Sequence, residues 1–110
     1  MGYIAHYRGH LREYLERFHE SMLLREVTLD EFLGERYPPS LLERFPEQAQ
    51  ADLEQETSEI AAATVPGDTL WLWRRVDSRG RSDGSSSEWG GLAVRRAGKV
   101  VRVWLVWEEH

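Results

Sequence analysis

Residues 88–107, EWGGLAVRRAGKVVRVWLVW, decide the fold of this chain. Two apolar segments flank the polar segment RRAGK at 95–99, and this arrangement predicts a β-hairpin. Gly98 suits a positive φ, whereas Ala97 is poor in that conformation. We therefore predict a three-residue loop with Gly98 in the left-handed position, in preference to a two-residue turn.

This loop fixes a register between the two arms of the hairpin. The second arm, 99–107, is apolar on both faces, which is typical of a strand inside a sheet. Only three residues follow it, so in a simple meander it would be an edge, and a bare apolar edge invites pairing with another chain. The predicted pairs are Arg95 with Lys99, Val94 with Val100, Leu92 with Arg102, and Gly90 with Trp104, whose indole would cover the glycine.

The sequence before the hairpin is mostly of helical type. Apolar residues at intervals of three and four predict an amphipathic helix over 3–25. Thr28 begins a capping box and a short helix that ends near Tyr37, before two prolines. A second capping box at Ser40 is followed by a helix over 47–63, with its apolar side directed inward.

One more strand is predicted at 69–76, where leucines and tryptophans alternate. The polar, glycine-rich segment 77–87 is expected to form a loop. At 110 residues the chain forms one domain, with a helical part at 1–65 and a β part at 66–110. We predict an α+β fold in which N-terminal helices pack on a C-terminal three-stranded antiparallel β-meander.

Composition excludes several classes of function. The chain has no cysteine, so disulfides and thiolate metal sites are ruled out. Its net charge of −5 argues against a nucleic-acid partner. No segment approaches the ~18 apolar residues of a membrane span, and no secretion signal is recognisable, so we expect a cytoplasmic protein without a membrane partner.

Charge is unevenly distributed between the two parts. Residues 1–65 hold 13 acidic and 6 basic side chains, whereas residues 66–110 hold 6 acidic and 8 basic ones. Well-solvated helices explain this difference, but it can also guide self-association or attract a charged partner.

No constellation of residues predicts catalysis or a cofactor. His6 and His10 are four apart and form a weak candidate metal pair on one face of the expected helix. They lack the adjacent glutamate of the HExxH zinc motif. The serines cluster at 82 and 85–87 on the expected loop, which is a poor frame for a preorganised nucleophile. We therefore predict no catalytic residues, no metal and no cofactor.

The five tryptophans are the unusual feature of the composition, and all of them fall on the predicted sheet. A core explains most of them, but strand alternation directs some to the second face of the sheet. Tryptophan and arginine together are typical of interaction hot spots. The predicted interface or ligand-binding residues are Trp71, Trp73, Trp89, Arg102, Trp104 and Trp107.

Two resemblances follow from the strand segments. The segment GLAVRRAGKVV at 91–101 is similar to a hairpin of GNAT acetyltransferases, but the chain lacks the glycine-rich pyrophosphate-binding turn and is too short for that fold. The pattern PGDTLWLW at 66–73, followed by GLAV at 91–94 and GKVV at 98–101, resembles small uncharacterised bacterial α+β proteins. That resemblance covers the last 45 residues and implies no activity.

Two functional hypotheses follow. The first is a non-enzymatic interaction or regulatory protein of bacterial type that forms a homodimer through its tryptophan-rich C-terminal sheet, alone or with another protein partner. The second is a small-molecule-binding protein or enzyme with a tryptophan-lined pocket, rimmed by Arg75 or Arg102.

Overall fold

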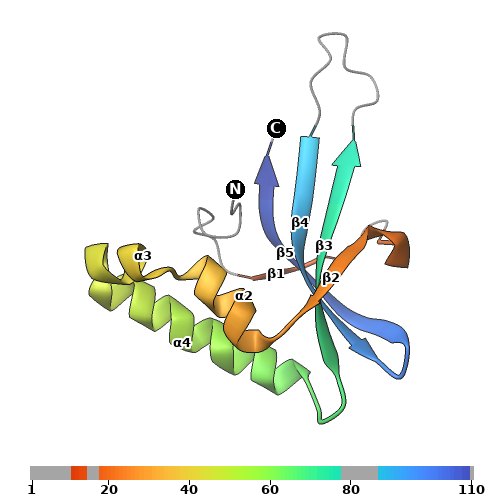
Figure 1. Cartoon of the computed structure of the whole chain (residues 1–110), viewed down its shortest axis with the longest axis horizontal. Helices are drawn as coiled ribbons and strands as arrows, with labels where there is room; N and C mark the ends of the chain where they lie inside the picture. Colours follow the sequence, from red (N-terminus) through yellow and green to blue (C-terminus); the bar gives the residue numbers. More distant parts are fainter. Residues whose placement is uncertain (1–10, 15–17, 78–86, 110) are drawn as a thin grey trace, which may run out of the picture.

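The computed structural model describes residues 11–14, 18–77 and 87–109. They form an antiparallel sheet of five strands in the order β1-β5-β4-β3-β2, with three α-helices on one side of it (Figure 1). The α+β class is confirmed. The elements along the chain are β1 (Arg12–Glu13), the 3₁₀ helix η1 (Glu20–Met22), β2 (Leu23–Val27), α2 (Leu29–Arg36), α3 (Pro39–Arg44), α4 (Pro46–Ala63), β3 (Thr69–Asp77), β4 (Ser87–Arg96) and β5 (Lys99–Glu109).

The predicted three-stranded meander is wrong, because β1 and β2 precede the helices and extend the sheet at both ends. The helix predicted over 3–25 is likewise wrong wherever the structure describes it. Residues 23–27 pair with β3, whose edge would otherwise lack a partner, and residues 12–13 pair with β5. Backbone pairing with a free sheet edge has here overridden a helical spacing of apolar residues.

The predicted hairpin exists, but its turn and register differ from the prediction. Arg96 pairs with Lys99, so the turn has two residues, Ala97 and Gly98, with φ of 52° and 81°. Both lie in the left-handed region, as in the primed turns whose twist matches that of the flanking strands. This match outweighs the roughly 1–2 kcal/mol that a left-handed conformation costs alanine.

The register of the β4–β5 pair also shifts at two places. They lie between Val94 and Arg95 and between Gly90 and Gly91. Each inserts an extra residue on β5 and so changes which face the following side chains occupy. The observed pairs are Arg95 with Val100, Val94 with Arg102, Leu92 with Trp104, and Gly90 with Trp107, so Trp107 and not Trp104 covers Gly90.

The predictions for α2 and α4 were more successful than that for residues 3–25. The capping box at the start of α2 is present, with Thr28 accepting a hydrogen bond from the Glu31 backbone and the Glu31 carboxylate bonding back to the Thr28 N–H. Helix α4 covers the predicted range and buries Ala49 and Ile60. The second capping box is wrong, because α3 begins at Pro39 and not after Ser40.

The sheet has two differently built faces. The face toward the helices is mostly aliphatic but includes two tryptophans: Leu72, Leu92, Val94 and Val106 pack there with Trp104, Trp107 and helix residues such as Phe32 and Ile60. The outer face is more aromatic: Trp73, Ala93, Val103 and Leu105 are buried there beneath Tyr14, Phe18 and Met22, with Trp71 and Trp89 beside them. The predicted alternation of β3, leucines on one face and tryptophans on the other, is confirmed.

Candidate functional site

The predicted site residues fall into two groups. Trp73, Trp104 and Trp107 are buried and belong to the packing of the two faces. Trp71, Trp89 and Arg102 are half-buried and retain exposed surface. The candidate metal pair, His6 and His10, lies outside the described residues.

The buried indole of Trp73 crosses the sheet. Its Nε1 donates a hydrogen bond of 3.0 Å to the carbonyl oxygen of Trp104, on the strand beyond β4. The residue it crosses is Gly91, where an added Cβ would collide with that same carbonyl group. Because Gly91 has no side chain, the Trp73 indole can approach the Trp104 carbonyl across β4. The Trp73 side chain thereby connects three strands, β3, β4 and β5.

Arginines lie over the two half-buried indoles of the outer face. The Arg75 guanidinium carbon is 4.8 Å from the ring centroid of Trp89, its partner across the β3–β4 pair. The Arg95 guanidinium carbon is 5.6 Å from the centroid of Trp71. Each contact leaves a cation and an aromatic edge at the surface, a combination common in recognition surfaces.

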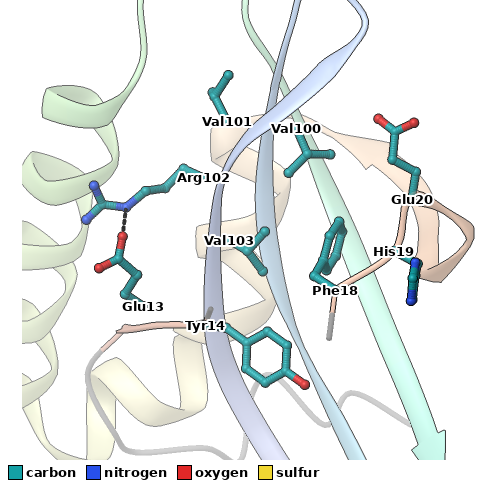
Figure 2. A pocket seen from close by; sticks show the side chains of 9 residues that line it. All are labelled: Glu13, Tyr14, Phe18, His19, Glu20, Val100, Val101, Arg102 and Val103. Atoms are coloured by element: carbon teal, nitrogen blue, oxygen red, sulfur yellow. Dashed lines mark ion pairs between the residues drawn. The ribbon is translucent and has the colours of Figure 1, made fainter. Parts of the chain in front are cut away.

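Between the N-terminal segment and β5 lies a hollow of about 530 Å³, which we call the β5 hollow. Phe18, Val100 and Val103 form its apolar floor, while Glu13 and Arg102 stand at one rim and His19 and Glu20 at the other (Figure 2). The lining residues are Glu13, Tyr14, Phe18, His19, Glu20, Val100, Val101, Arg102 and Val103.

The β5 hollow opens along the edge of β5. Val100 and Val103 belong to the outer-face cluster, whereas Arg102 lies over the Trp104 ring of the helix-side cluster, so a hollow lined by 100–103 follows the strand's edge. Strand β1 covers this edge only at Trp104 and Leu105, and the Tyr14 N–H donates to the Val103 carbonyl 2.9 Å away. Among the described residues, no strand pairs with the outer edge of 99–102.

The rim of the β5 hollow carries both signs of charge. Arg102 Nε lies 3.6 Å from a Glu13 oxygen, and a Glu20 oxygen lies 4.0 Å from Nε of Arg95, which is outside the lining of the hollow. Neither Nε makes a hydrogen bond within the described structure. These loose pairs neutralise the rim without closing it, so an incoming chain could exchange partners with them at small cost.

Sequence reasoning named Arg102 but missed the other residues of the β5 hollow. Tyr14 and Phe18 are among the apolar residues whose spacing predicts the helix over 3–25, but in the structure Tyr14 lies against Trp73, with ring centroids 4.8 Å apart. Their apolar character was a usable signal of burial. What the sequence did not show was that about 85 residues further along the chain β5 would supply the opposite wall.

Outside the β5 hollow, one polar cluster is buried between α2 and α4. Arg36 and Glu56 are each 1% exposed and form a two-fold ion pair, with N–O distances of 2.5 and 2.7 Å. Burial of the Tyr37 phenol, together with its hydrogen bond to Glu56, raises the pKa of Tyr37. The cluster ties the two helices together.

Within residues 11–14, 18–77 and 87–109, no group of three histidine or acidic side chains is placed to hold a metal ion. In that part of the chain, no helix is long and apolar enough to cross a membrane.

Comparisons with protein-family models, with curated proteins and with solved structures find no significant match for this chain.

Proposed function

We propose that this chain is a non-enzymatic interaction protein that self-associates along the outer edge of β5. The observation that carries the proposal is the position of the β5 hollow beside an edge, 99–102, that pairs with no strand among residues 11–14, 18–77 and 87–109. In strand addition, edge backbone groups supply hydrogen bonds, and an adjoining pocket takes side chains of the added strand. The bacterial regulatory role and a cytoplasmic location belong to the same proposal.

The exposed side chains of this edge support the proposal. Val101 is 48% exposed in the middle of segment 99–102, with Arg102 beside it. Exposed edge strands in monomeric proteins are commonly protected by charge or a short length. Strand β1 protects two residues of the β5 edge, whereas the apolar Val100 and Val101 have no such cover within the described structure. Two copies paired antiparallel through this segment would join their sheets into one.

Sedimentation velocity over a micromolar concentration range tests the proposal. We expect the wild-type chain to shift from monomer to dimer as its concentration rises. Val101→Lys places a charge on the edge and should move this transition by about tenfold or more in concentration.

Val65→Lys is the matched control, because Val65 is 51% exposed but lies in the turn before β3. It should leave the monomer–dimer transition unchanged. A wild-type chain that stays monomeric at every concentration, or equal responses of the two lysine variants, would contradict the proposal.

The volume of the β5 hollow favours a second candidate function, small-molecule binding. About 530 Å³ lies within the range of ligand sites. Its described lining contains Arg102 but no tryptophan, in contrast to the pocket expected from the sequence. Fragment screening by NMR separates the two functions: a ligand should shift residues 100–103 of the monomer and leave the sedimentation behaviour unaltered.

A further inference from the structure

A second hollow, the α2–α4 groove, lies in the helical layer between α2 and α4. Helices α2 and α4 run side by side and are joined through α3 (Figure 1). The groove between them measures about 690 Å³. It is lined by Leu29, Asp30, Leu33, Gly34 and Tyr37 of α2 and by Gln50, Leu53, Glu54, Thr57 and Ser58 of α4.

Charge distinguishes this groove from the β5 hollow. Residues 29–63, which contain the three α-helices, hold nine acidic and two basic side chains, a net charge of −7 against −5 for the whole chain. One of the two cations, Arg36, is buried against Glu56. The described lining of the groove includes Asp30, Glu54 and leucines, and no cation is among these residues.

Gly34 is a second feature of the groove, independent of its charge. It stands inside the eight-residue helix α2, where glycine is the least favourable residue after proline. Its φ is not positive, and a Cβ added there would meet nothing within 4 Å. No contact among the described residues therefore requires this glycine, and the space that it leaves open would admit a second backbone lying in the groove.

The floor of the groove is held in place by the buried cluster. The Arg36–Glu56 ion pair bridges the two helices, and Tyr37 lines the groove while its hydroxyl bonds to Glu56. Both walls are thus fixed before any partner arrives, which reduces the entropy lost on binding.

We propose that the α2–α4 groove binds an amphipathic helix of a partner protein, with apolar residues toward Leu33 and Leu53 and basic residues toward Asp30 and Glu54. A helix in an apolar groove is a common mode of recognition. The negative charge of the groove selects a basic helix over an acidic one and speeds its association at low salt. This inference is independent of the β5 edge.

A synthetic leucine–lysine peptide of about sixteen residues, long enough to form a helix, is a suitable probe. We expect the full-length chain to bind it, with an affinity that falls as salt rises. A leucine–glutamate peptide of the same pattern should not bind. Gly34→Leu, which fills the open space, should weaken binding about tenfold.

Ala51→Leu is the matched control, since Ala51 is exposed on α4 but does not line the groove. It should bind the peptide like the wild type. Gly34→Ala should raise the melting temperature while weakening binding, which separates the role of the glycine from folding.

Three outcomes would overturn the proposal. In the first, the peptide does not bind. In the second, Gly34→Leu and Ala51→Leu bind the peptide equally well, which would mean that charge alone attracts it. In the third, Gly34→Leu changes the sedimentation of the protein alone and leaves peptide binding intact, so that a second copy occupies the groove. Because Val101→Lys should alter sedimentation and not peptide binding, failure of one proposal can be distinguished from failure of the other.

Discussion

Arg36 and Arg75 show how differently the two sides of this molecule are built. Arg36, in the helical layer, is 1% exposed, and two of its guanidinium nitrogens each donate a hydrogen bond to one oxygen of the Glu56 carboxylate. Arg75, on the outer face, lies over Trp89 and donates a hydrogen bond of 2.8 Å to the Tyr14 hydroxyl. The side chain of Arg75 is 17% exposed. The arginine of the helical layer thus makes one buried, two-fold ion pair, whereas the arginine of the outer face makes several single, partly exposed contacts.

This difference has consequences for function. A face held by weak, half-exposed contacts can lose or exchange one of them without unfolding the subunit. The proposed self-association at β5 uses that tolerance. The α2–α4 groove, in contrast, has walls that a buried ion pair holds at a fixed spacing, and it suits a partner of fixed shape.

The largest expected effect comes from breaking the buried ion pair. Arg36→Met leaves the Glu56 carboxylate buried without its cation and should lower the free energy of unfolding by about 3–5 kcal/mol. Urea denaturation measures this loss. The double variant Arg36→Met, Glu56→Leu removes both charges and should recover most of it. If the double variant is as unstable as the single one, packing and not charge explains the effect.

The sequence predicted what depends on neighbouring residues. The capping box at Thr28 needs only a glutamate three residues later, and the alternation in β3 needs only residues 69–77. The positions of β1 and β2 could not be predicted in this way, because strand pairing depends on which distant edge is free. Residues 23–27 are a strand because β3 lies beside them, about 45 residues further along the chain.

The same reasoning explains the outcome for the candidate site. Composition and alternation named six candidate residues, of which Trp71, Trp89 and Arg102 retain exposed surface, and their role in binding stays a prediction. The β5 hollow and the α2–α4 groove each need two segments that only the fold brings together. Even the hairpin register depended on a turn in which Ala97 adopts a conformation unfavourable for its type.

Two glycines give the next largest effect, with opposite signs. Gly91→Ala on the outer face would drive its Cβ against the Trp104 backbone carbonyl and the Trp73 indole, which should cost about 1–3 kcal/mol. Gly34→Ala meets nothing within 4 Å and should stabilise α2 by up to about 1 kcal/mol. Thermal unfolding of both variants measures the contrast, and a stabilising Gly91→Ala would refute the crossing of β4 by Trp73.

Two buried tryptophans, one on each face, sharpen the comparison further. Trp73 donates a hydrogen bond to the Trp104 carbonyl, whereas Trp104 Nε1 is buried without an acceptor in the described structure. Trp73→Phe should therefore lose about 1 kcal/mol for the hydrogen bond in addition to the lost volume. Trp104→Phe loses a similar volume but removes an unsatisfied donor, and its stability should stay closer to that of the wild type. Equal losses in urea denaturation would mean that packing alone decides both.

The smallest effect is expected at Arg75, the outer-face counterpart of Arg36. Arg75→Gln removes the cation from the Trp89 ring, a contact worth about 0.5–1 kcal/mol at a partly exposed site, and the part-buried hydrogen bond to the Tyr14 hydroxyl, worth about 0.5 kcal/mol. Arg75→Lys keeps the charge and should cost less, although it loses the planar stacking of the guanidinium. Urea denaturation of the two variants beside Arg36→Met compares one residue type in two environments. A loss at Arg75 as large as that at Arg36 would show that the outer face is as dependent on a single contact as the helical layer, and would remove the tolerance on which self-association at β5 relies.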